Sequence, residues 1–170
     1  MKEQGLSLPE LVVTLAVLAL LASLGCQSGS EALARQRLES ASRALSQGIE
    51  RARNSALRKH APCAMRISTN GWSTAGEGVL PTCLPDAIAL QEGNVAVGDL
   101  RLTHNMPAEL RFSSNGLVLD GGTVVLTMRG TNLRRCLVMA LPLGVVRVGR
   151  YAADPNASPD SAACLPDPSL

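Results

Sequence analysis

Residues 6–26 read LSLPELVVTLAVLALLASLGC, an almost purely apolar run with one acid, Glu10, just inside its start. A short leader, residues 1–5, precedes the run, and in it Lys2 is offset by Glu3. A carboxylate at membrane depth costs a few kcal/mol or more, so by default it is a functional group with a partner. The run therefore predicts a transmembrane helix in which Glu10 has a specific contact to make.

The expected partner of Glu10 is a newly formed N-terminus. If the chain is cut after Gly5, the α-amino group of Leu6 becomes a cation beside the apolar helix. Glu10 of a neighbouring copy can then neutralise that cation within the low-dielectric interior of a helix bundle. This geometry polymerises helices side by side, and it predicts assembly as the function.

The run Gly5-Leu6-Ser7-Leu8-Pro9-Glu10-Leu11-Val12-Val13-Thr14-Leu15 resembles the class III signal of type IV prepilins and type II secretion pseudopilins. The resemblance implies that prepilin peptidase cuts after Gly5, methylates the N-terminus of Leu6 and leaves residues 6–26 as a filament-building helix. Glu10 then matches the acid at the fifth mature position, whereas Leu6 replaces the usual phenylalanine. The implied location is the bacterial inner membrane, with one span and a periplasmic head.

Two other export signals compete for the same segment. An ordinary secretory signal has a basic leader and a shorter apolar region, and neither matches residues 1–26. A lipoprotein signal is suggested by Leu24-Gly25-Cys26, although Ser23 stands where that motif prefers leucine. Cleavage before Cys26 would discard the helix and leave a lipid anchor, so the mass of the mature protein distinguishes these alternatives.

Composition limits the remaining functions. The 170 residues suit one modest domain plus the N-terminal helix, and a net charge of +2 favours no class of partner. The aromatic residues are Trp72, Phe112 and Tyr151, so the core must be aliphatic. His60 and His104 have no base-like or metal-spaced companions nearby. We therefore expect no enzyme, no cofactor and no metal site.

Four cysteines lie beyond the membrane segment, at Cys63, Cys83, Cys136 and Cys164. An even set in an exported domain indicates disulfides, because the compartment is oxidising. Four cysteines allow three connectivities. We favour Cys63 with Cys83 and Cys136 with Cys164, since each bond would fix a Gly/Pro-rich loop to a neighbouring strand. A metal site would require closely spaced pairs such as C-x-x-C, which the sequence lacks.

Residues 27–62 continue the helix as an amphipathic half. Glycines at 25 and 29 weaken helix propensity around residues 27–30, so a flexing joint is expected there. Arginines and Lys59 are expected to form the solvent-exposed face of this half. Ala61-Pro62 is expected to end the helix. Apolar or small residues recur at helical spacing, at Leu38, Ala41, Leu45, Ile49, Ala52 and Ala56.

The head, residues 63–170, has the pattern of β-strands. Asn115-Gly116 and Asp120-Gly121-Gly122 provide turns between three of the strands. We predict an α+β, pilin-like fold, in which the long helix lays its alanine-rich stripe on an antiparallel sheet. The proline-rich tail from residue 152 to 170 should be irregular and held by Cys164. Strands are expected at residues 64–68, 100–103, 110–113, 117–119, 123–128, 137–141 and 145–148.

The head also resembles the C-terminal half of GspH-type pseudopilins and FimT/FimU-type minor pilins, through residues 111–116, 123–126 and 144–150. The shared pattern is a phenylalanine before a glycine turn, a strand with glycine-bearing flanks, and a closing strand with glycine and arginine. This resemblance implies a minor pilin that primes or caps a type IV pilus together with other minor and major pilins. The alternative is a GspH-like minor pseudopilin of a type II secretion system.

A third reading is a DNA-binding minor pilin for DNA uptake. Some FimT-type proteins bind DNA through a Gly-Arg-x-Arg pattern, and here Val145 replaces its first arginine. The candidate DNA contacts are Arg134, Arg135, Arg147 and Arg150, which would form a small basic patch with weak, salt-dependent binding. The competing interpretation is that these arginines protect a strand edge from aggregation.

Overall fold

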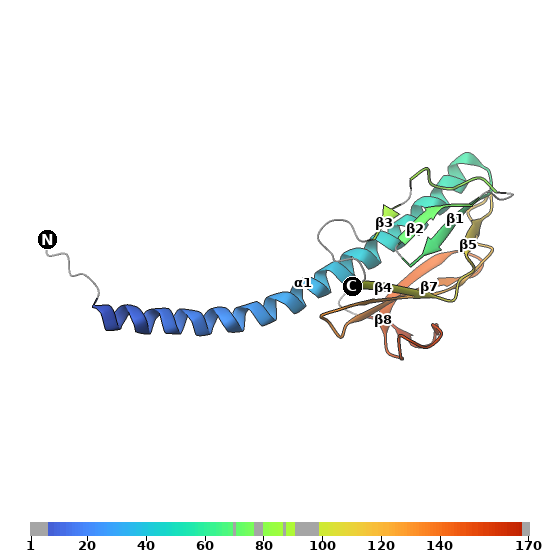
Figure 1. Cartoon of the computed structure of the whole chain (residues 1–170). Helices are drawn as coiled ribbons and strands as arrows, with labels where there is room; N and C mark the ends of the chain where they lie inside the picture. Colours follow the sequence, from blue (N-terminus) through green and yellow to red (C-terminus); the bar gives the residue numbers. More distant parts are fainter. Residues whose placement is uncertain (1–6, 70, 77–79, 87, 91–98, 168–170) are drawn as a thin grey trace.

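The structure, a computed structural model, describes residues 7–69, 71–76, 80–86, 88–90 and 99–167, except for the side chains of residues 24–28 and 88–89. A single long helix, α1 (Leu8–Lys59), leads from the N-terminal end into a β-rich head. Figure 1 shows that the first part of α1 stands clear of the head and that its second part lies across the strands. The predicted α+β architecture is confirmed.

α1 is continuous through residues 27–30, where the glycines predicted a joint, and it curves gently along its length (Figure 1). The helix stops where Ala61-Pro62 predicted. His60 adopts a left-handed conformation with φ 47°, and its backbone N–H donates to the carbonyl of Leu57 at 3.3 Å. Such a residue closes a helix by satisfying one of the last free carbonyls.

The second part of α1 buries the stripe that the sequence predicted. Each member of the stripe is at most 7% exposed, and Ala34 extends it by one turn towards the N-terminus. Alanines and one glycine let the helix approach the strands closely. At Gly48 an added Cβ would lie 2.7 Å from the ring of Trp72, so no larger residue fits without displacing the indole.

The strands divide between two antiparallel sheets, whereas the sequence predicted one. The first sheet has the order β3 (Ile88–Ala89), β2 (Gly71–Thr74), β1 (Cys63–Ser68), β5 (Glu109–Phe112). The second has the order β4 (Leu100–His104), β6 (Gly122–Met128), β7 (Arg134–Ala140), β8 (Val145–Tyr151), β9 (Cys164–Leu165). α1 contacts strands of both sheets and so provides their common core.

Most predicted strands are present with shifted ends, but residues 117–119 do not form one. That segment makes only an isolated bridge, between Phe112 and Val118, because the N–H of Val118 donates to the carbonyl of Pro142, in the turn between β7 and β8, instead of extending a strand ladder. The short strands β2, β3 and β9 were not predicted.

Both favoured disulfides are confirmed. Cys63 bonds Cys83 and Cys136 bonds Cys164, with Cα–Cα distances of 4.9 and 5.8 Å. The second bond fixes β9, so the otherwise irregular tail gains one short strand next to β8. The side chain of Cys26 lies outside the described residues.

Candidate functional site

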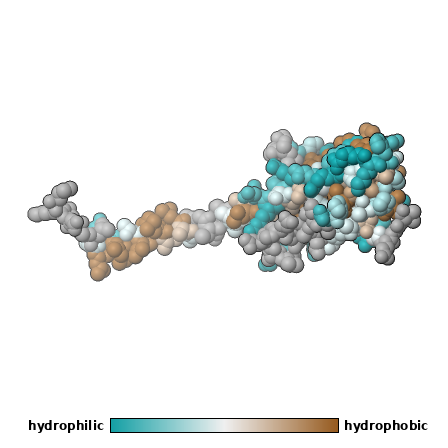
Figure 2. Space-filling view, turned by 90° about the horizontal axis from the view of Figure 1, so that it is seen from above, coloured by the Kyte–Doolittle hydropathy of each residue, from teal (hydrophilic) through white to brown (hydrophobic). Residues whose placement is uncertain are grey.

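Large apolar side chains cover the first part of α1, which stands clear of the rest of the described residues (Figures 1 and 2). Nine of them are between 48% and 80% exposed. They occupy nine of the fourteen positions from 8 to 21 and therefore surround the helix instead of forming one stripe. A helix that is apolar on all sides belongs in a core or a membrane. The nine are Leu8, Leu11, Val12, Val13, Leu15, Val17, Leu18, Leu20 and Leu21.

No helix is both long and apolar enough to cross a membrane among the residues that the structure describes. The predicted transmembrane segment, residues 6–26, reaches beyond them, since Leu6 and the side chains of residues 24–26 lie outside the described part. Gly5, and with it the predicted cleavage and methylation site, lies outside as well.

Glu10 lies in the first turn of α1, next to Pro9, and is exposed. A carboxylate there is favourable, because the free N–H groups and the helix dipole make that end of the helix positive. Among the described residues no side chain or backbone group pairs with Glu10. The geometry thus presents a single acid, surrounded by apolar side chains, to whatever covers this end of the helix.

The four candidate DNA-contacting arginines do not form one patch. Neighbouring residues of a strand point to opposite faces of its sheet. Arg135 and Arg150 are cross-strand partners on the face towards α1, whereas Arg134 and Arg147 lie on the other face. Arg134 donates to the carbonyl of Ala153 at 2.7 Å. Arg147 donates to the carbonyl of Ser161 at 3.4 Å.

Arg135 is not a surface residue, which corrects its assignment as a DNA contact. Its side chain is only 3% exposed and pairs with Glu39 of α1 and with Asp167 of the tail. Nε donates to Glu39 at 2.7 Å, and Nη1 donates to Asp167 at 2.5 Å. Burial lowers the pKa of Arg135, but the hydrogen bonds and the negative charges of the two carboxylates together raise it by more. This ion triad connects helix, sheet and tail.

A second ion pair joins Arg111 of β5 to Asp120. Arg111 donates to both carboxylate oxygens, at 2.7 and 2.8 Å. This hydrogen bonding holds the pKa of Asp120 below its ordinary value, although partial burial acts in the opposite direction. Because Asp120 precedes β6, the pair fixes the loop that follows residue 113 against β5.

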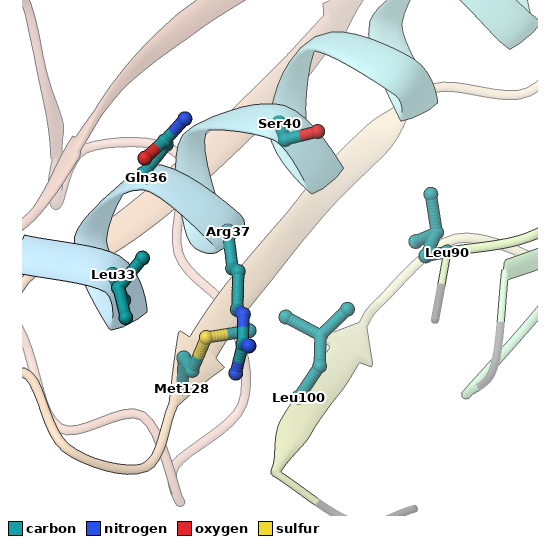
Figure 3. Close-up of a pocket in the computed structure, with 7 residues that line it drawn as sticks. All are labelled: Leu33, Gln36, Arg37, Ser40, Leu90, Leu100 and Met128. Carbon is teal, nitrogen blue, oxygen red and sulfur yellow. The ribbon is translucent and has the colours of Figure 1, made fainter. Parts of the chain in front are cut away.

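A pocket of about 260 Å³ lies where α1 enters the head, and Figure 3 shows Arg37 reaching into it from the helix, beside Met128 and Leu100. Leu33, Gln36, Ser40 and Leu90 complete its lining. Arg37 is the one charged group of this lining, and nothing in it is arranged as a nucleophile with a base. Within the described residues no three His, Cys, Asp or Glu side chains lie close enough to hold a metal ion.

Sequence reasoning missed the partners of Arg135. Glu39 follows Leu38 of the buried stripe, but Arg35 likewise follows the buried Ala34 and is exposed, so the pattern did not single Glu39 out. Asp167 lies in a proline-rich tail without periodicity, so no pattern pointed to it.

The family model described as type II transport protein GspH matches residues 41–142, more than half of the chain. No curated protein and no solved structure matches. The matched region begins at Ala41, near the start of the buried stripe, and ends in the turn between β7 and β8. It excludes the N-terminal run, so the match rests on the second part of α1 and on the head.

Proposed function

This chain belongs to the GspH family of type II transport proteins, and we propose that it is a minor subunit of a pilus-like fibre, in the first place a minor pseudopilin of a type II secretion system. The alternative is a minor pilin that primes or caps a type IV pilus, since both machines share the same N-terminal chemistry. The description of the family favours secretion.

The observation that carries this proposal is the first part of α1, residues 8–21, whose apolar side chains are exposed and which has Glu10 near its start. We call this part the bare helix. Burying a large apolar side chain is worth about 1.5–3 kcal/mol. Nine exposed ones therefore represent on the order of 20 kcal/mol of unused burial. The head does not need them, because its core closes around the stripe that begins at Ala34. Other helices, first in the inner membrane and then in the fibre, supply the missing contacts.

Glu10 sets the register of this packing. Prepilin peptidase exposes and methylates the amine of Leu6, and Glu10 of the adjacent subunit accepts its charge. At about 4 Å and an effective dielectric constant of 20, two unit charges attract by about 4 kcal/mol. A subunit without the acid leaves a neighbour's cation unpaired in an apolar bundle, at a cost of about 3–5 kcal/mol.

The test replaces Glu10 in the full-length chain and measures its incorporation into fibres. Glu10→Ala is expected to reduce incorporation at least tenfold, with Glu10→Asp milder, because the latter retains the charge. Glu31→Ala is the matched control, since Glu31 is an exposed acid of the same helix in an i,i+4 pair with Arg35. Unchanged incorporation of the Glu10→Ala chain would refute the proposal.

Deletion of the gene separates the two machines. Loss of protein secretion with normal pilus number indicates a pseudopilin, and the reverse indicates a minor pilin. Restoration by the wild-type chain, but not by Glu10→Ala, ties either phenotype to assembly.

A further inference from the structure

The head carries a second exposed apolar surface, at the end opposite to the bare helix. Apart from the first part of α1, eight large apolar side chains are exposed among the described residues. Six of them lie on three segments that meet at this end of the head, and we call them the distal patch: Leu57, Leu117, Leu119, Leu141, Leu143 and Val145. The other two, Leu33 and Leu165, lie elsewhere.

Three contacts bring the members of the distal patch together. Gly116 lies against Leu57, because a Cβ added there would be 2.7 Å from the leucine side chain. The N–H of Val118 donates to the carbonyl of Pro142 at 2.9 Å, which joins the loop after β5 to the turn between β7 and β8. Gly121 packs against Leu141 in the same way. The patch therefore combines the end of α1 with two loops.

The apolar side chains of the distal patch are more than half exposed at four positions, from 53% at Leu119 to 58% at Leu143. Single exposed leucines are ordinary, but a group of large apolar side chains exposed at one end of a head marks an interaction site. Lipid is excluded as the occupant. At 1.5 Å per residue, the helix from Leu21 to Arg53 spans about 48 Å, so the patch points away from any membrane that holds the bare helix.

The charged side chains around the distal patch indicate which kind of partner binds there. Arg58 and Lys59, the last residues of α1, flank Leu57 and are exposed. The carboxylates described at this end are already engaged, Glu50 with Arg53 at 3.9 Å and Asp120 with Arg111 at 2.7 Å. The rim is therefore basic. Two copies meeting through this surface would bring two basic rims together, which is unfavourable.

We propose that the distal patch docks the head of a different pilin-like subunit, one step further along the fibre, through an apolar spot bordered by carboxylates. The inference rests on the proposed function, because subunits whose helices pack side by side with an axial offset present this end to the next head. Apolar contact would supply the affinity, and the basic rim would select the acidic partner and exclude a second copy.

The test uses the full-length chain in cells that assemble the fibre, with the photo-crosslinker benzoylphenylalanine in place of Leu143. Leu165 provides the matched control position, because it is 51% exposed on the same head but outside the patch. We expect crosslinks from position 143 to another pilin-like subunit, at least five times stronger than from position 165. Equal crosslinking at both positions, or crosslinks to a second copy of this chain, would overturn the inference.

Substitutions complete the experiment. Leu143→Asp should reduce copurification of the crosslinked subunit at least tenfold, whereas Leu165→Asp should change it less than twofold, with the unfolding temperature unchanged in both. Arg58→Glu should weaken copurification at low salt but not at about 1 M salt, where charges are screened beyond about 3 Å. Arg129→Glu, at the other end of the head, is the control.

The two proposals fail separately. If the wild-type chain is present in the fibre but position 143 crosslinks to no other subunit, the distal patch is not a docking surface and the proposed function stands. If the Glu10→Ala chain enters the fibre normally, the proposed function fails instead.

Discussion

Replacing Arg135 by methionine is expected to destabilise the head by about 3 kcal/mol. The guanidinium is 3% exposed, and Glu39 and Asp167 are 23% and 14% exposed. Removing one partner of a buried ion pair costs about 3–5 kcal/mol, since it leaves uncompensated charge. Both carboxylates keep some access to water, which places this case at the lower end of the range.

The loss should be visible as a fall in unfolding temperature. The entropy of unfolding is about 2.1 cal/mol/K per residue, so a head with its helix half, about 140 residues, loses about 3.4 °C per kcal/mol. Arg135→Met should therefore lower the midpoint by about 10 °C. The assay is thermal unfolding at pH 7, followed by circular dichroism, on a fragment beginning at residue 30, ahead of the buried stripe.

Arg134→Met is the matched control, because Arg134 is the adjacent residue but makes a single hydrogen bond to a backbone carbonyl. Arg134→Met should lower the unfolding temperature by less than half as much as Arg135→Met. Adding Glu39→Gln and Asp167→Asn to the Arg135→Met chain removes the uncompensated charges and should recover at least half of the loss. If Arg135→Met lowers the unfolding temperature by less than about 3 °C, or if both arginine variants lower it equally, the triad does not hold the tail and the helix to the sheet.

Two further predictions concern the same fragment. Gly48→Val should destabilise it by about 1–3 kcal/mol through overpacking against Trp72, whereas Gln47→Val on the exposed side should have a much smaller effect in urea unfolding; equal midpoints would contradict the close approach. Asp120→Asn should lower the unfolding temperature more at pH 6 than at pH 2: the pKa of Asp120 is lower in the folded than in the unfolded state, where it is about 3.9, so its stabilisation is complete above that pH and is lost as the pH falls through the folded-state value. A difference between the two chains that is as large at pH 2 as at pH 6 would refute this reading.

The helix was predictable because its signal is periodic and long. Leu38, Leu45 and Ile49 repeat at helical spacing over several turns, and Pro62 leaves little freedom in where the helix ends. The number of cysteines predicted two disulfides, and the Gly/Pro-rich loops between them favoured the pairing that the structure has. In each case the information lies in residues close together in the sequence.

The unpredicted features depend on contacts between distant segments. β9 has two residues and exists because Cys164 is bonded to Cys136. Residues 117–119 alternate like a strand, yet they lie over the turn between β7 and β8, where only Val118 meets the core. The four arginines looked like one basic patch in the sequence, but strand alternation distributes them over two faces. The prediction missed this division because it began the strand at residue 137, whereas β7 begins at Arg134.

The central claim is that the mature chain keeps its apolar helix and begins at the residue whose amine Glu10 of a neighbour accepts. The most direct measurement is the intact mass of the chain isolated from assembled fibres. The account predicts a polypeptide that starts at Leu6, carries one added methyl group and retains all of α1. A lipid-modified polypeptide starting at Cys26, or any other start that removes Glu10, would contradict it.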